Sequence, residues 1–309
     1  MINILSRQPS LVAEIQAAGP FDLGESIRFL HGFAPASRED EEEEPGVLRL
    51  AFPVEGSWKH AGAVVRQRAP GGVEVEIHAP AEIAPDALVQ VRRILSLDVD
   101  GSGFDKLGDP VLRKLQERYP GLRPVLFHSP YEAACWAIIG NRIRIAQAAK
   151  VKRRIAEEHG EIVEVDGRRL ISFPDPETLL AAEPPSNLLL AKAAQLNAIA
   201  AAAADGRLDA EPLRAMPAAQ AQAQLQRLPG IGPFSAQLIL IRGVGHPDVF
   251  PADEPRLHAE MRHAYHLESA DISKLEKIAE GWRPYRSWAA LLLRSDRERR
   301  TGEIRRAGR

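Results

Sequence analysis

The stretch Leu228-Pro229-Gly230-Ile231-Gly232-Pro233-Phe234-Ser235-Ala236 is followed by an apolar helical run and then by Phe250-Pro251-Ala252-Asp253-Glu254-Pro255. Two glycines in Gly-x-Gly spacing let the backbone turn tightly with its N–H groups unobstructed. The residues after them open a helix, and the N-terminus of a helix favours a phosphate oxygen. The two acids precede a proline, which is typical of a carboxylate at the start of the next helix. Together the two stretches predict a phosphate-binding turn that faces a carboxylate.

From Leu228 to Met261 the chain resembles the helix–hairpin–helix DNA glycosylase superfamily, and within it the bacterial 3-methyladenine DNA glycosylase II family. A Pro-Gly-Ile-Gly turn alone also occurs at ordinary helix–turn–helix corners, so the spacing to the two acids carries the resemblance. Further segments resemble the same family: Ile94–Asp98, Gly121–Pro124, Ala137–Asn141 and Trp282–Ala289. The resemblance implies a monomeric base-excision enzyme that hydrolyses the N-glycosidic bond of alkylated purines, such as 3-methyladenine and 7-methylguanine, in damaged double-stranded DNA.

Composition predicts a soluble globular protein of the cytoplasm, associated with the nucleoid through DNA. No run approaches eighteen apolar residues, and the first residues lack the basic-then-apolar order of an export signal. The single cysteine, Cys135, excludes internal disulfides and a cysteine-ligated iron–sulfur cluster, and its neighbours predict that it is buried. Despite a net charge of −2, charge is separated along the chain, because residues 39–44 are all acidic whereas residues 283–309 hold nine arginines and three acids.

Patterning predicts an α+β protein, with an antiparallel sheet domain over residues 1–98 and an all-α domain over residues 99–309. Alternating segments such as Val47–Phe52 and Val73–His78 indicate strands, and Ser26–Leu30 and Asp86–Val91 indicate short helices. The helix–hairpin–helix falls at about residues 225–242. Helices are expected over Tyr131–Ile139 (with Ser129 as cap), Ile145–His159, Pro176–Ala182, Asn187–Asp205, Pro217–Arg227, Ser235–Arg242, Pro255–Tyr265, Lys274–Ala279 and Tyr285–Arg297.

The two acids are the candidate catalytic groups. Cleavage of a glycosidic bond develops positive charge on the sugar, and a carboxylate beside C1′ stabilises it. In the family the second acid of Phe-Leu-Pro-Asp-Asp is catalytic, and that position falls on Glu254. Asp253 is the shorter acid and the better helix cap, so it remains an alternative.

The resemblance also implies a DNA surface and a reaction type. It assigns DNA binding to the hairpin residues Leu228, Gly230, Ile231, Gly232 and Ser235 and to an intercalating loop at Asn141 and Arg142, with Arg142 filling the space left by a flipped base. Superfamily members that also cleave the strand use a lysine where this chain has Phe234, so we expect a hydrolase without lyase activity. A monovalent cation at the backbone of Gly230 and Gly232 is the one cofactor that the family suggests.

Aromatic faces attract cationic alkylated bases, so we consider Trp136, Tyr285, Trp288 and Phe234 for the base pocket, with Trp282 as a further aromatic. Helical aromatics usually pack in a core, which is the alternative for Trp136, Trp282, Tyr285 and Trp288, and Phe234 is either a core or a pocket residue. The family's pocket tryptophan near the chain end matches Arg294, which would repel a cationic base. This departure and Glu254 leave open a second hypothesis, a DNA-damage-binding protein without catalysis, and a third, a glycosylase for another purine lesion.

Overall fold

A computed structural model describes residues 8–33, 35, 44–183 and 189–302. Its larger sheet is antiparallel in the order β1-β4-β3-β2, with β1 (Leu11–Gln16), β2 (Val47–Pro53), β3 (His60–Ala69) and β4 (Gly72–His78). The alternating burial along β4 follows the two-residue period of a strand. Helices α1 (Leu23–His31) and α2 (Ala84–Ile94) share one apolar core with this sheet.

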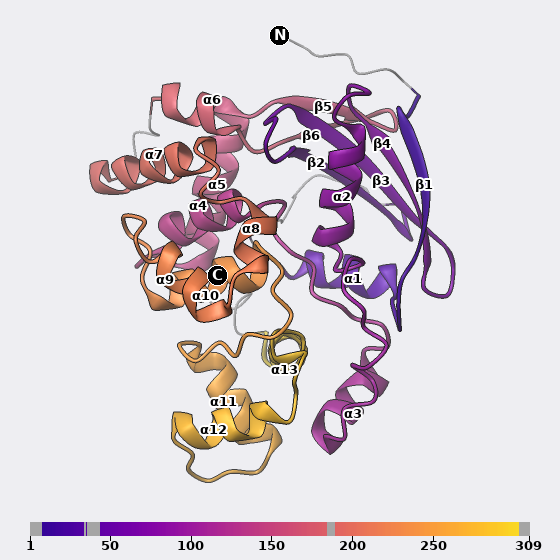
Figure 1. The fold of residues 1–309 in the computed structure, drawn as a ribbon, viewed down its shortest axis with the longest axis vertical. Helices are drawn as coiled ribbons and strands as arrows, with labels where there is room; N and C mark the ends of the chain where they lie inside the picture. The colour runs from indigo at the N-terminus through magenta and orange to yellow at the C-terminus, as the bar shows by residue number, and fades with distance from the viewer. Residues whose placement is uncertain (1–7, 34, 36–43, 184–188, 303–309) are drawn as a thin grey trace.

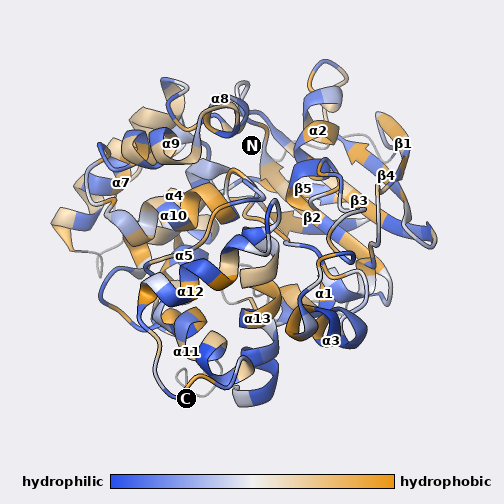
Figure 2. Cartoon of the chain, turned by 60° about the horizontal axis from the view of Figure 1, so that its bottom comes forward, coloured by the Kyte–Doolittle hydropathy of each residue, from blue (hydrophilic) through white to orange (hydrophobic). Residues whose placement is uncertain are grey.

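Helices make up most of the remaining chain (Figure 1). Their bounds are α3 (Pro110–Arg118), α4 (Pro130–Gly140), α5 (Ile145–His159), α6 (Pro176–Ala181), α7 (Leu190–Ala204), α8 (Ala210–Ala215), α9 (Ala218–Leu225), α10 (Pro233–Arg242), α11 (Pro255–Ala264), α12 (Ile272–Glu280) and α13 (Arg286–Thr301). In Figure 1, α4 to α10 lie beside the sheet, and α11 to α13 lie below them. Figure 2 shows that α3 is largely hydrophilic. No helix of the described residues is long and apolar enough to cross a membrane.

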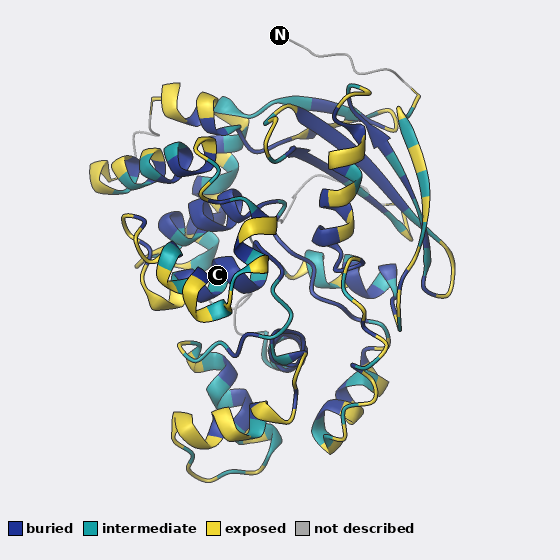
Figure 3. Cartoon of the chain, in the orientation of Figure 1, coloured by how far each residue is buried: buried dark blue, intermediate teal, exposed yellow. Residues whose placement is uncertain are grey.

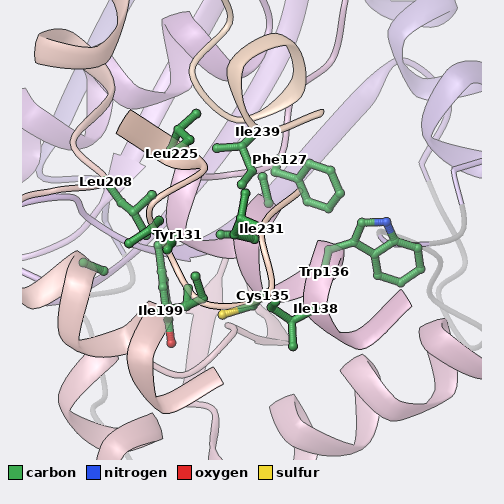
Figure 4. Packing of buried hydrophobic residues seen from close by; sticks show 14 of the residues in the cluster. Phe127, Tyr131, Cys135, Trp136, Ile138, Ile199, Leu208, Leu225, Ile231 and Ile239 are labelled. Carbon is green, nitrogen blue, oxygen red and sulfur yellow. The ribbon is translucent and has the colours of Figure 1, made fainter. Parts of the chain in front are cut away.

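The helical core is centred on α4, which is buried along nearly its whole length (Figure 3). Ser129 caps α4 by accepting a hydrogen bond from the Glu132 N–H, as the sequence predicted. Figure 4 shows Cys135 and Ile138 of α4 among apolar side chains of α7, α9 and α10. The prediction that Cys135 is buried is therefore confirmed, and burial raises the pKa of its thiol.

A second, two-stranded sheet departs from the all-α prediction for residues 99–309. Strands β5 (Ile162–Val165) and β6 (Arg168–Ile171) form a hairpin whose turn residues Asp166 and Gly167 have φ of 51° and 72°. Asp-Gly between alternating residues is a strong hairpin signal, which our assignment of one helical period to the whole region overlooked. The hairpin packs against strands β2 and β3 of the larger sheet. Val165 occupies the space that a side chain at Gly62 would need.

The predicted helices agree with the structure to within a few residues at their ends. Three further elements, β1, α3 and α8, were not suggested by the pattern. Most of the acidic run, residues 39–43, lies outside the described residues, as do residues 187–188 at the expected start of α7 and the last seven residues. The domain division at residue 98 stays a prediction.

Glu132 of α4 is a buried carboxylate that joins α4 to α5. Lys152 places its Nζ 2.6 Å from Oε1 of Glu132, and Oε2 accepts a hydrogen bond of 3.2 Å from the His128 backbone N–H. Burial opposes ionisation, but the charges of Lys152 and His128 outweigh it and hold the pKa of Glu132 well below its usual range.

We expect Glu132→Gln to lower the free energy of unfolding by about 3 kcal/mol at pH 7, because it leaves the Lys152 charge buried without its partner. The pKa is lower in the folded state, so this difference is complete above the ordinary value of 4.5 and shrinks as the pH falls below it. Urea unfolding at pH 7 and below pH 4 measures both effects. Glu158→Gln is the control, since its pair with Arg154 is exposed and should contribute less than about 1 kcal/mol.

Candidate functional site

The turn between α9 and α10 is shaped by two glycines in different ways. Gly230 has φ of 82°, and a Cβ there would lie 2.7 Å from side-chain atoms of Ile138 and Gln195. Only glycine fits this backbone and this contact. Gly232 has φ of −89°, and an added Cβ would meet nothing within 4 Å. The missing side chain at Gly230 thus lets the turn pack against α4 and α7, whereas the space beside Gly232 is open.

Backbone donors face this open space. Gly232 is the N-cap of α10, and the N–H groups of Phe234 and Ser235 in the first turn have no partner within the helix. In the described part of the chain, no loop or turn hydrogen bond between backbone atoms uses the N–H of Gly230 or Gly232. A helix N-terminus with free N–H groups is an anion site, so the predicted phosphate contact has a suitable geometry.

The hairpin residues predicted to bind DNA divide into two groups. Gly230 and Gly232 are exposed, and Ser235 is half-buried. Leu228 and Ile231 are buried, and Figure 4 shows Ile231 beside the core residue Ile239. The side chains of Leu228 and Ile231 therefore anchor the turn, and only their backbone is left for a phosphate.

The loop after α4 holds the predicted intercalating residues at the surface. Asn141 ends α4, and Arg142 is exposed with φ of 58°. Lys192 of α7 donates to the carbonyl oxygens of Ile139 and Asn141 at 2.7 and 2.8 Å, and burial lowers its pKa. The last turn of α4 and the start of the loop are thus bonded to a second helix.

Helix α7 supports the hairpin turn as well as this loop. Gln195, about one helical turn beyond Lys192, packs against Gly230, and Ile138 of α4 packs there too. The α4 loop and the α9–α10 turn therefore share the same two supporting helices. One bound strand could contact both.

The two acids lie at the start of α11 and have different surroundings. Glu254 is the N-cap, with Oε1 accepting a 3.1 Å hydrogen bond from the Arg256 N–H and lying 4.0 Å from Nε of Arg294. Asp253 is exposed, and its carboxylate has no hydrogen-bond or ion-pair partner among the described residues. Its own N–H donates to Oε1 of Gln237 at 3.2 Å, so α10 fixes the backbone next to both acids.

Four aromatic rings connect α1 to α4. Phe29 and Phe33, one helical turn apart by spacing, stack at 5.5 Å between ring centroids, and Phe33 meets Phe127 edge-on at 5.2 Å. The ring centroid of Phe127 in turn lies 6.4 Å from that of Trp136, and both side chains are labelled in Figure 4. Sequence reasoning had selected Trp136 alone. The spacing of Phe29 and Phe33 was the signal that could have found the others.

Arg242, at the end of α10, covers this aromatic row, and sequence analysis had not singled it out. Its guanidinium carbon lies 5.0 Å from the ring centre of Phe29 and 4.4 Å from that of Phe33. One terminal nitrogen donates to the Val125 carbonyl at 2.7 Å, but the buried Nε has no hydrogen-bond partner. Burial, together with the positive charge of Arg294, lowers the pKa of Arg242 to about 9.

The remaining pocket candidates lie in two places. Phe234 is 45% exposed at the start of α10, and the four-residue spacing puts it on the same helix face as Leu238 and Arg242. Tyr285 and Trp288 pack against Phe104 in the C-terminal core, and Trp282 is fully buried there.

The structure does not bring Tyr285 and Trp288 to the two acids. The hydroxyl of Tyr285 donates to the Asp100 carbonyl, and Trp288 lies 5.2 Å from the Arg123 guanidinium. Arg294 follows Trp288 by six residues, so the two side chains leave α13 about 120° apart. Trp136 therefore lies at the aromatic row and Arg294 at Glu254, whereas Phe234 is exposed at the start of α10.

The cation expected at the backbone of Gly230 and Gly232 stays a prediction. The Gly232 carbonyl accepts the Ala236 N–H at 2.9 Å, and the Leu228 carbonyl accepts the Ile231 N–H at 3.1 Å. In the described part of the chain no group of three histidine, cysteine or acidic side chains could hold a metal ion.

Comparison with known proteins points to one superfamily. The chain is 28% identical over 283 residues to DNA-3-methyladenine glycosylase 2 of Escherichia coli, covering 88% of this chain and 93% of that protein. It is 27% identical over 204 residues to the DNA-3-methyladenine glycosylase of Bacillus subtilis, covering 64% and 67%. No family model matches.

Solved structures have the same fold. The 3-methyladenine DNA glycosylase from Archaeoglobus fulgidus superposes with a TM-score of 0.75 at 24% identity, covering 91% of this chain and 96% of that one. An 8-oxoguanine glycosylase/lyase of Clostridium acetobutylicum, solved with double-stranded DNA, has a TM-score of 0.62 at 16% identity, covering 94% and 99%. The predicted sheet followed by a largely helical part is thereby confirmed.

The two glycines give a matched test of the hairpin. Gly232→Ala adds a methyl where a phosphate would approach, without a clash in the free protein, so we expect duplex DNA to bind about tenfold more weakly. Stability should fall by no more than about 1 kcal/mol, the difference between glycine and alanine as N-cap. Gly230→Ala should instead unfold at lower temperature, because it meets Ile138 at an unfavourable φ. Fluorescence anisotropy measures DNA binding, and thermal unfolding measures stability. Unchanged DNA binding by Gly232→Ala would contradict the predicted phosphate site.

Proposed function

Because the chain belongs to the helix–hairpin–helix DNA glycosylase superfamily, we propose that it hydrolyses the N-glycosidic bond of damaged purines, alkylated purines among them, in duplex DNA. One observation carries the proposal. Gln237 of α10 bonds the backbone at Asp253, so the helix whose N-terminus can hold a phosphate also fixes the two acids. A strand held at Gly232 would have its sugar within reach of a carboxylate.

The proposed reaction uses Glu254 at the sugar. As the base departs, positive charge develops at C1′, and the carboxylate stabilises that charge and orients the attacking water. The ion pair with Arg294 at 4.0 Å and the hydrogen bond from the Arg256 N–H both involve Oε1 of Glu254, which leaves Oε2 to accept from the attacking water. Arg142, exposed on the supported loop, would fill the space of the extruded nucleotide.

Asp253 remains the alternative carboxylate. Its side chain is exposed and without a partner among the described residues, whereas Glu254 also serves as the cap of α11. The same capping contact favours a second candidate function, a damage-binding protein in which Glu254 only stabilises the helix.

Substitution of each acid separates these assignments. We expect purified protein to release free base from methylated duplex DNA, and Glu254→Gln to slow release at least a hundredfold, because it removes the charge that stabilises the sugar cation. Chromatography of the released bases is the measurement, with DNA affinity measured alongside. Asp253→Asn is the matched control and should keep most of the activity.

If only Asp253→Asn abolishes release, Asp253 takes the catalytic role. If wild type releases no base from any damaged duplex but binds it more tightly than undamaged DNA, the chain is a damage-binding protein.

The enzyme should also act without cleaving the strand. Phe234 cannot form a Schiff base with the sugar, so the product is an intact abasic strand. Gel electrophoresis of a labelled duplex should show no break until alkali is added, and borohydride should trap no protein–DNA adduct. A trapped adduct would show that another amine of the protein forms a Schiff base with the sugar.

A further inference from the structure

Arg294 interacts with both a candidate catalytic carboxylate and a second guanidinium group. Arg294 of α13 lies 4.0 Å from Glu254, and its charge also acts on Arg242 of α10. Arg256, whose N–H bonds the Glu254 side chain, adds a third cation to the start of α11. His258, which burial and Arg262 keep at a lowered pKa, packs on Phe250 on the next turn. Arg294 thus places a positive charge at Glu254, and this charge also reaches Arg242.

Arg242 lies beside an aromatic surface that is partly open. Its guanidinium lies over Phe29 and Phe33, which are both half-buried, so this aromatic surface is still partly open. The buried Nε of Arg242 lacks an acceptor, and a buried donor without a partner is costly. Negative charge on a molecule bound beside the guanidinium would offset part of that cost. A cation on the bound molecule would instead add a third positive charge to two that already repel.

The charge of the leaving base decides what these guanidinium groups do for the reaction. When the C1′–N9 bond breaks, its electron pair stays on the base. An N3- or N7-methylated purine is cationic and leaves as a neutral molecule. An uncharged purine leaves with developing negative charge, which fixed positive groups stabilise as the bond breaks.

We propose, resting on the glycosylase function above, that Arg294 and Arg242 make this enzyme selective for uncharged damaged purines bearing an exocyclic oxygen, such as hypoxanthine, over cationic N-methylpurines. The electron pair of the C1′–N9 bond passes to the base, and the oxygen of water bonds to C1′. The proton that water loses goes to the departing base, so sugar and base are both released neutral. The guanidinium groups stabilise the base while it carries the extra charge.

The test compares two lesions with one protein preparation. Duplexes of the same sequence carry either hypoxanthine or 7-methylguanine at one position, and single-turnover release is divided by the spontaneous rate of each. We expect wild type to accelerate hypoxanthine release more. Arg294→Met keeps length but removes charge and should shift the ratio of accelerations about tenfold towards 7-methylguanine. Arg294→Lys keeps the charge and should retain most of the wild-type ratio.

The ratio is measured within one variant, so partial unfolding of that variant lowers both rates and leaves it unchanged. A wild-type preference for 7-methylguanine, or a ratio that Arg294→Met leaves unaltered, would overturn the selectivity while the glycosylase function stands. Release of neither base, nor of any base from methylated DNA, would overturn both.

Discussion

The contact of Gly230 with α4 and α7 is the constraint on which the rest of the site depends. Ile138 and Gln195 leave no room for a side chain there, so the α9–α10 turn lies directly on the helical core. That position sets the start of α10, and Gln237 on α10 in turn bonds the backbone at Asp253. A loss of packing at one glycine would therefore move a phosphate site and two carboxylates together.

Helix α7 also holds the surface loop after α4. Lys192 bonds the end of α4 at Ile139 and Asn141, which places Arg142 on the core that also supports the hairpin. Groups that must grip one distorted duplex gain from such shared support, because geometry held by packed helices varies less than geometry held by loops alone. The proposed DNA contacts are thus coupled through buried packing, although they lie far apart in sequence.

Local patterns predicted most of the elements, because caps and periodicity are encoded within a few residues. Ser129 and Pro130 defined the start of α4, and the two glycines defined the hairpin. The β5–β6 hairpin was also encoded, in Asp166 and Gly167, but was overlooked. Base-pocket candidates were less predictable, because aromatic residues look alike in sequence whether they line a pocket or a core. Trp288 proved to pack on Phe104 and Arg123, which only tertiary structure reveals.

Arg242 shows why charge at such a site cannot be judged from sequence totals. The chain carries a net charge of −2, yet the Arg242 guanidinium lies over Phe29 and Phe33 without an ion-paired carboxylate among the described residues. Burying a charge in this way is costly, and the Val125 carbonyl and two ring faces offset only part of that cost. A purely structural role would be filled more cheaply by a leucine or methionine. The retained cation therefore acts most effectively when negative charge appears beside it, which is the condition that a departing uncharged purine creates.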